Sequence, residues 1–216
     1  MMNAAFQRIL DLLFPKNYVC LMCNREAYAP SNQLCDICRS RLHGSSGYNS
    51  IEIPQIDGFK WTFLFDSTTQ GCIHRLKYGN CKYLGEFLAQ FIEIPEDWQI
   101  DYIIPVPLHK KRLKKRGYNQ AELIANALGK RLNIEVRADI LLRVIDTKTQ
   151  TSRTRTERSQ ALKGAFNVAG SIEGKHILLI DDVCTTGATL TACAQELIKA
   201  KAARIYAATV CYTPKQ

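Results

Sequence analysis

The chain has 216 residues, 46% of them hydrophobic, which is enough for one α/β domain and a small additional module. Its 29 Lys and Arg residues outnumber the 20 Asp and Glu residues, and the net charge of +9 suits a polyanionic partner, although it also simply favours solubility. No segment approaches about 18 consecutive apolar residues, so no membrane span is expected. Nine cysteines without a recognisable export signal predict a reducing compartment, the cytoplasm.

The N-terminal part predicts a helix followed by a metal module. Residues 1–15 carry apolar side chains at helical spacing. Two cysteine pairs follow, separated by eleven residues: Cys20 and Cys23, then Cys35 and Cys38. Each pair can form one knuckle of a closed tetrahedral site, so the spacing predicts a structural zinc ribbon. Redox-active or unpaired thiols are the alternative interpretation, and His43 is a lower-ranked alternative ligand.

The next segment predicts the start of an α/β domain. Residues 44–58 contain Gly, Ser, Asn and Pro and indicate a linker or a hairpin. Residues 59–66 have the composition of a strand, and a helix is expected to begin at 67–71. Residues 83–93 place apolar side chains on one helical face and predict a second helix.

A basic run lies between the next strand and helix. The strand is predicted at 101–107 and the helix at about 119–132. Between them, six Lys or Arg residues fall within 110–116. Such a run is usually a solvated surface. Here we expect a loop at the carboxyl end of a strand, on the ligand-binding edge of a parallel sheet.

A polar segment separates two elements of the core. Residues 139–145 predict a strand or its approach, and residues 164–166 return the chain to the core. The segment 146–163 between them has little apolar content, so we expect a mobile loop. It could close as a lid and bring Arg155 or Arg158 to a ligand.

Residues 177–190 are the most informative stretch. An apolar run at 177–180 predicts a buried parallel strand that ends in two carboxylates, Asp181 and Asp182, and a helix is expected at 189–200. The free N–H groups of a helix N-terminus make the intervening turn a candidate phosphate site. The turn and helix start contain Cys184, Thr185, Thr186, Gly187, Ala188 and Thr189. The acidic pair alone is equally compatible with a helix cap and a turn.

This string resembles the phosphoribosyl-pyrophosphate (PRPP) motif of type I phosphoribosyltransferases. The resemblance implies that Asp181 and Asp182 hold the ribose hydroxyls and that the turn from Cys184 to Thr189 holds the 5′-phosphate, with Mg²⁺ accompanying PRPP. At Cys184, a thiol pKa lowered by the helix N-terminus and a small residue in a tight turn are both open.

Further motifs extend the resemblance over nearly the whole chain. They are the zinc ribbon, Arg75-Leu76-Lys77-Tyr78-Gly79, the run from Pro105 to Gln120, and the polar residues from Thr147 to Arg158. Together they resemble the ComF family of competence-associated, phosphoribosyltransferase-like proteins. The resemblance implies a cytoplasmic bacterial protein linked to DNA uptake. Ala161 departs from the family, which usually has Asn three residues after the position of Arg158, and this weakens any detailed role for that part of the loop.

Two functions follow from the resemblance. In one, a PRPP-binding protein acts in DNA uptake, binds single-stranded DNA through basic residues near Tyr78, Tyr83 and Tyr118, and contacts a helicase-like competence protein. In the other, an active phosphoribosyltransferase transfers the phosphoribosyl group to an unidentified base or amine. The catalytic candidates are then Asp181, Asp182, Arg112 and Arg116, and the pyrophosphate candidates are Lys111, Arg112, Arg116, Arg155 and Arg158.

The expected fold is α/β and similar to type I phosphoribosyltransferases, with a mostly parallel twisted sheet flanked by helices. A final strand is predicted at 204–211. Residues 1–45 are expected to form the helix and zinc ribbon, and residues 46–216 the phosphoribosyltransferase-like domain.

Overall fold

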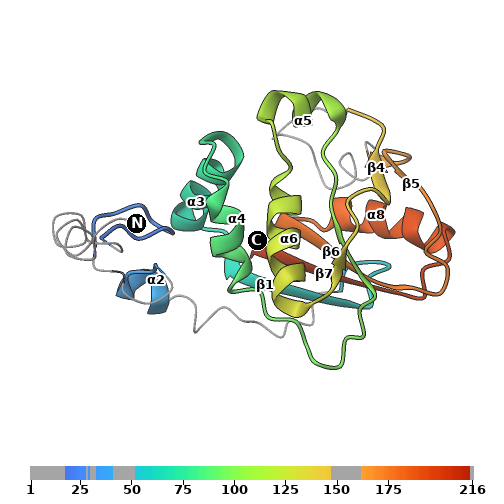
Figure 1. The fold of residues 1–216 in the computed structure, drawn as a ribbon, viewed down its shortest axis with the longest axis horizontal. Coiled ribbons are helices and arrows are strands. Elements are labelled where there is room, and N and C mark those ends of the chain that lie inside the picture. The colour runs from blue at the N-terminus through green and yellow to red at the C-terminus, as the bar shows by residue number, and fades with distance from the viewer. Residues whose placement is uncertain (1–17, 28, 30–32, 41–51, 147–161, 215–216) are drawn as a thin grey trace, which may run out of the picture.

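The computed structural model describes residues 18–27, 29, 33–40, 52–146 and 162–214 (Figure 1). The helix predicted at 1–15, His43, and Arg155 and Arg158 lie outside the described residues. The core is a five-stranded sheet in the order β1-β7-β6-β2-β3, with every neighbouring pair parallel. Its strands are β1 (Gly58–Leu64), β2 (Tyr102–Pro105), β3 (Glu135–Val136), β6 (His176–Cys184) and β7 (Arg204–Tyr212). The predicted α/β class is confirmed.

Helices cover both faces of the sheet. They are α3 (Ser67–Tyr78), α4 (Tyr83–Ala89), α5 (Lys110–Arg116), α6 (Gln120–Leu132) and α8 (Ala188–Lys199). A small helix, α2 (Asp36–Ser40), begins directly after Cys35 and contains Cys38. Strand β4 (Leu141–Arg143) pairs antiparallel with β5 (Phe166–Val168). Apart from their ends, the predicted strands and helices of the sheet domain are present.

The apolar run of β6 explains the layering. Leu178 and Ile180 are fully buried in one cluster with side chains of α3, α4 and α6. Ile177 and Leu179 are fully buried in a second cluster with side chains of α8 and the β4–β5 pair. A strand that is covered on both faces has a continuous run of apolar residues in its sequence.

Two local predictions are wrong. The basic run 110–116 forms helix α5 and is not a loop: Lys and Arg are good helix formers, and His109 and Gly117 cap the helix. Gly117 has φ +83° and donates to the carbonyl of Leu113 at 2.7 Å. Strand β6 also does not end at the acidic pair, because it stays paired with β7 through Cys184.

The acidic pair nevertheless lies where β6 is no longer paired on one side. Strand β2 ends at Pro105, which is paired with Ile180, so on this side β6 extends beyond its neighbour. Asp181 and Asp182 are the first residues of that extension. Beyond Ile180, β6 is therefore no longer paired with β2, and side chains from the helices reach the carboxylates on this side.

The cysteine module shares the core of the sheet domain. Cys20, Met22 and Leu34 are buried in the same cluster as residues of α3 and α4. The boundary near residue 45 stays a prediction. None of the helices in the described part of the chain has the length and apolar character needed to cross a bilayer.

Candidate functional site

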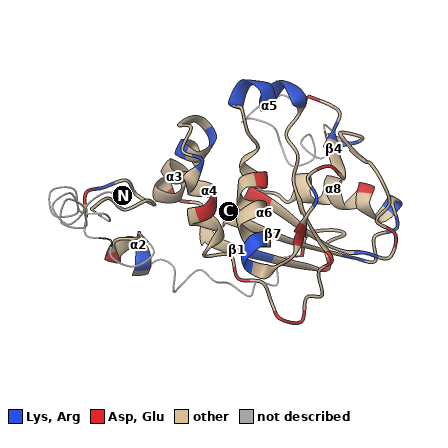
Figure 2. Ribbon diagram, in the orientation of Figure 1, with Lys and Arg blue, Asp and Glu red and all other residues tan. Residues whose placement is uncertain are grey.

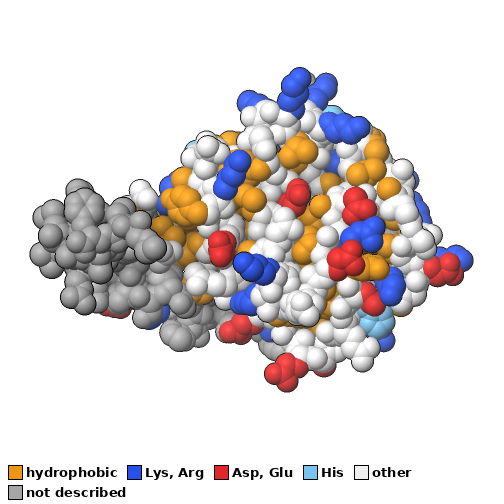
Figure 3. All heavy atoms as spheres, viewed as in Figure 1, with side chains coloured by type: hydrophobic (Ala, Val, Ile, Leu, Met, Phe, Trp, Pro, Cys, Tyr) orange, Lys and Arg blue, Asp and Glu red, His pale blue; other side chains and the backbone are white. Residues whose placement is uncertain are grey.

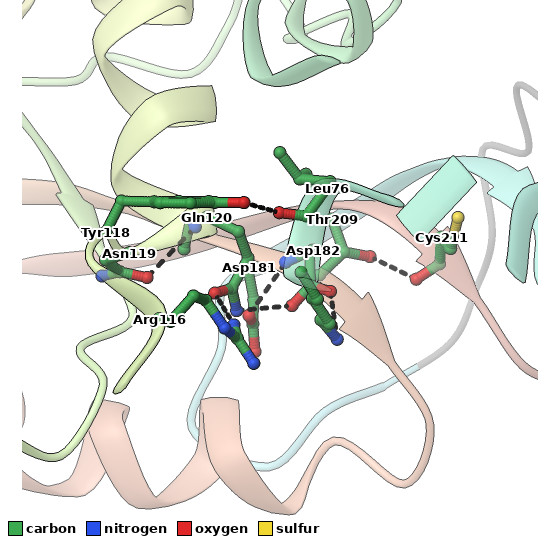
Figure 4. A network of polar contacts seen from close by, with 11 residues as sticks. Leu76, Arg116, Tyr118, Asn119, Gln120, Asp181, Asp182, Thr209 and Cys211 are labelled. Atoms are coloured by element: carbon green, nitrogen blue, oxygen red, sulfur yellow. Dashed lines mark hydrogen bonds and ion pairs between the residues drawn. The ribbon is translucent and has the colours of Figure 1, made fainter. Parts of the chain in front are cut away.

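The acidic pair lies in a network of charged and polar side chains (Figure 4). Asp182 is only 3% exposed and forms an ion pair with Lys77 at the end of α3. The side-chain amide of Gln120 donates to Asp182 Oδ1 at 3.1 Å, and its oxygen accepts from the guanidinium of Arg116. The backbone N–H of Asp182 donates to Asp181 Oδ1 at 2.8 Å. Helices α3 and α6 thus contact Asp182 directly, and α5 contacts it through Gln120.

The two carboxyl groups have opposite pKa shifts. Burial acts to raise the pKa of Asp182, but the Lys77 ammonium and the hydrogen bonds outweigh it and hold that pKa below its usual range. Burial and then the negative charge of Asp182 raise the pKa of Asp181 well above its usual range. The pair therefore favours one ionised and one protonated carboxyl group.

Asp181→Asn is expected to stabilise the free protein at neutral pH. A folded-state pKa above the unfolded value means that the folded protein binds more protons, so this carboxyl lowers stability as pH rises through its folded pKa. The asparagine oxygen can still accept from the Asp182 N–H. The melting temperature of the variant should exceed that of the wild type by a few degrees at pH 7, and the difference should shrink toward about pH 4, the ordinary Asp pKa. The exposed Asp97→Asn is the control, and an equal difference at all pH values would contradict the assignment.

The turn after β6 presents backbone donors. Gly187 is buried at φ +76° and is the N-cap of α8, and the Thr186 hydroxyl accepts from the Ala188 N–H at 3.4 Å. A Cβ atom at Gly187 would lie 3.2 Å from Ile53, so the position favours glycine both by conformation and by space. Thr185 is exposed, and Thr186 and Thr189 are half-buried. Free N–H groups and hydroxyls at this turn form a suitable cradle for an anion.

Cys184 does not have an activated thiol. Burial raises its pKa to about 12, and the nearby Asp181 charge acts in the same direction. The idea of a lowered pKa at the helix N-terminus is therefore wrong. Cys184 is the last residue of β6 and is packed in the cluster next to α8.

A basic cavity of about 450 Å³ opens between the end of α3 and helix α5. It is lined by Lys77, Tyr78, Asn80, Arg112, Lys115, Arg116 and Tyr118. The Arg116 guanidinium lies 5.1 Å from the centroid of the Tyr78 ring, within cation–π range. Lys111 is exposed and is not among the lining residues. Helix α5 is mostly Lys and Arg in Figure 2, and Lys and Arg side chains gather at the top of the same view in Figure 3.

The segment from Gly117 to Gln120 holds residues of the cavity wall in place relative to the sheet. The Tyr118 hydroxyl donates to the Leu76 carbonyl at 2.5 Å, which ties the connection between α5 and α6 to α3. The Asn119 side chain donates to the Val106 carbonyl at 3.0 Å and also caps α6. These bonds set the position of Gln120 and Arg116 relative to the acidic pair.

Three residues of the site received no role from the sequence. Lys77 and Gln120 stand within recognised motifs, but only the fold brings them to Asp182. Arg143 of β4 lies over the ring of Phe166 at 5.4 Å. Burial lowers the pKa of Arg143, as does the charge of Arg112, whereas Asp181 acts in the opposite direction. Arg143 therefore interacts electrostatically with Asp181.

The four-cysteine cluster (Cys20, Cys23, Cys35 and Cys38) fits a metal. Its sulfur atoms all lie within 4.8 Å of one another, and three of the four residues are buried. The sulfurs of Cys23 and Cys35 are 3.9 Å apart. A tetrahedral zinc site with Zn–S bonds of about 2.3 Å requires sulfurs about 3.8 Å apart. Burial and then the negative charge of Cys20 raise the pKa of Cys38. The positive charge of a bound metal ion would act against both effects and favour the thiolates.

Comparison with known proteins agrees with this geometry. Residues 113–216 match the family model described as "Phosphoribosyl transferase domain". Competence protein F of Haemophilus influenzae is 29% identical over 201 residues, covering 81% of this chain and 88% of that protein. Competence protein ComFC of Bacillus subtilis is 28% identical over 218 residues, covering 94% and 88%. The chain is a relative of the ComF competence proteins. The resemblance predicted from its motifs is confirmed.

Other matches are shorter or more distant. The DNA utilization protein YhgH of Shigella flexneri is 34% identical over 113 residues, and the alignment spans 52% of this chain and 50% of that protein. The chain thus matches about half the length of these relatives. The PRPP amidotransferase of B. subtilis (19% identity, TM-score 0.40) covers 63% of this chain, which spans 26% of that protein. A hypoxanthine phosphoribosyltransferase of Staphylococcus aureus (19%, 0.36) covers 65% of each. Structural similarity this low supports no functional assignment.

Proposed function

We propose that the chain is a PRPP-binding, phosphoribosyltransferase-like protein of the ComF type that acts in DNA uptake. The observation that carries this proposal is that three features lie together at the carboxyl ends of strands in the parallel sheet. The acidic pair, the turn at 185–187 and the basic cavity lie at the carboxyl end of β6 and β2. Ligands bind at this end of open α/β sheets. The relatives are named as competence proteins or as a DNA utilization protein, and these names support a role in DNA uptake.

Each part of PRPP has a chemically suitable partner. The ribose hydroxyls would donate to Asp181 and Asp182, and the 5′-phosphate would accept from the turn at 185–187 and the start of α8. The pyrophosphate would contact Arg112 and Arg116, whose guanidinium groups match phosphate oxygens. Weaker candidates are Lys111 in α5 and, from the sequence alone, Arg155 and Arg158. Carboxylate, hydroxyl and phosphate oxygens are ligands that Mg²⁺ prefers, so Mg²⁺ would accompany PRPP.

Isothermal titration of PRPP with Mg²⁺ into the full chain tests this function. We expect saturable binding and a rise in melting temperature, because a ligand at 100 times its Kd stabilises a protein by about 2.7 kcal/mol. Ribose 5-phosphate and pyrophosphate, each alone, should bind more weakly than PRPP. A wild-type protein that binds none of the three would refute the pocket.

Turnover is the second candidate function. The cations near the acidic pair favour it, since they could neutralise charge on a departing pyrophosphate. A nitrogen nucleophile would form a bond to the anomeric carbon as the bond to pyrophosphate breaks. Release of pyrophosphate that depends on an added base or amine would distinguish turnover from binding.

Single-stranded DNA is the proposed macromolecular ligand of the basic surface. Arg112→Ala with Arg116→Ala is expected to weaken binding and to reduce the slope of log K against log salt by about 1.4, because two phosphate contacts are lost. Fluorescence anisotropy with an oligonucleotide measures both. Lys199→Ala with Lys201→Ala, both 70% exposed on another surface, removes the same charge and is the control. Unchanged affinity and slope in the arginine variant would contradict this assignment.

One further partner and the cellular location complete the proposal. A helicase-like competence protein is proposed from the sequence resemblance alone. A cytoplasmic location is supported by nine cysteines that are all free.

A further inference from the structure

Helix α3 contacts both the four-cysteine cluster and the acidic pair. Arg75 binds the turn between Cys20 and Cys23, and Lys77 binds Asp182. Residues two apart on a helix point to different sides, so one short segment can reach two separate sites. In Figure 1, α3 lies between the N-terminal module and α5. Because both residues belong to one helix, the position of the cysteine turn can affect the position of Lys77 at the acidic pair.

The contact of Arg75 depends on the shape of the cysteine turn. Its guanidinium donates to the carbonyls of Leu21 and Met22, the latter at 2.9 Å, and to Asn24 Oδ1 at 3.0 Å. The turn is closed by the Asn24 N–H, which donates to the Cys20 carbonyl at 2.8 Å. Metal coordination by both cysteines of the pair would fix this turn. The acceptors of Arg75 therefore hold their places only while the turn is formed.

Lys77 borders both parts of the proposed ligand pocket. Its ammonium pairs with Asp182, and its side chain also lines the basic cavity. Burial acts to lower the pKa of Lys77, but the charge of Asp182 outweighs it and raises that pKa, so the group stays charged. The bond from Tyr118 to the Leu76 carbonyl holds the adjacent residue in place. A fixed cation thus stands between the ribose side and the pyrophosphate side.

We propose that Lys77 is a ligand-contacting residue of the pocket and that Arg75 positions it by fixing α3 to the four-cysteine cluster. This inference rests on the proposed PRPP site. In the free protein the Lys77 ammonium neutralises Asp182. When a pyrophosphate group enters the cavity, the same ammonium can contact it and leave Asp182 able to accept from a ribose hydroxyl. The four-cysteine cluster then affects ligand affinity in addition to stability.

A double-mutant cycle on the full chain tests this arrangement. The variants are Lys77→Met, Arg75→Gln and their combination, each titrated with PRPP and Mg²⁺ and assayed for bound zinc. Lys77→Met should weaken PRPP binding roughly tenfold or more, as loss of a charged hydrogen bond predicts, and Lys77→Arg should recover part of it. Arg75→Gln should weaken binding severalfold with zinc retained. The combined variant should bind about as weakly as Lys77→Met alone, because the effects are coupled.

Milder changes keep the test decisive if Arg75→Gln folds poorly. Asn24→Gly removes one acceptor of Arg75 and suits the positive φ of 60° at that position, so it should cause a smaller loss of affinity in the same direction. Gln70→Ala, exposed on α3, is the control. Additive losses from Arg75 and Lys77, or wild-type affinity in Lys77→Met, would overturn this inference alone. Failure of the wild type to bind PRPP would overturn the proposed function and this inference with it.

Discussion

Replacing Asp181 and Asp182 together with alanine is expected to abolish the stabilisation of the protein by PRPP and Mg²⁺. Both carboxyl groups would be lost as acceptors for the ribose hydroxyls. A hydrogen bond to the ionised Asp182 is worth about 1.5–3 kcal/mol, and one to the protonated Asp181 about 0.5–1.5 kcal/mol. Losing two such bonds should reduce affinity by roughly a hundredfold or more. Thermal shift and isothermal titration measure the effect.

The double variant also changes the free protein, and the controls must separate the two effects. Asp182→Ala leaves Lys77 without its ion-pair partner in a half-buried position, so the melting temperature of the free protein should also fall. Glu96→Ala with Asp97→Ala removes two adjacent exposed acids and is the matched control. A folded Asp181→Ala, Asp182→Ala protein that binds PRPP like the wild type would contradict the role of the acidic pair.

Cys35→Ser is expected to remove the bound zinc and to destabilise the chain by several kcal/mol, because binding energy at a structural metal site is folding energy. Cys35 is 7% exposed and belongs to the same cluster as Leu34 and residues of α3. Loss of the metal should therefore loosen part of the main core as well as the module. Zinc analysis of protein purified under reducing conditions, together with thermal unfolding, measures both effects.

The matched control is a cysteine outside the cluster. Cys81→Ser changes a half-buried cysteine after α3 and should keep both the zinc and most of the stability. Wild-type protein without zinc, or Cys35→Ser with unchanged zinc content, would rule out the metal site.

Several elements could be predicted because their signals are local. The run Ile177–Ile180 is apolar throughout, and a strand buried on both faces is the structure that requires such a run. The residues of the turn at 185–187 stand next to one another in the sequence, so their proximity was certain before folding. The basic run at 110–116 was misjudged because it has no apolar stripe, and its helix is set instead by the high helix propensity of Lys and Arg and by the caps at His109 and Gly117.

The sequence by itself determined the residue types that carry chemistry: four cysteines at knuckle spacing, two adjacent carboxylates, and a glycine-containing turn before a helix. Only the tertiary structure decided which cations meet the carboxylates. Lys77 reaches Asp182 because α3 packs on the face of the sheet that buries Leu178 and Ile180 of β6, and Arg75 reaches the cysteine turn from the same helix. Contacts between distant segments depend on how buried faces pack together, and a pattern along one segment does not contain that information.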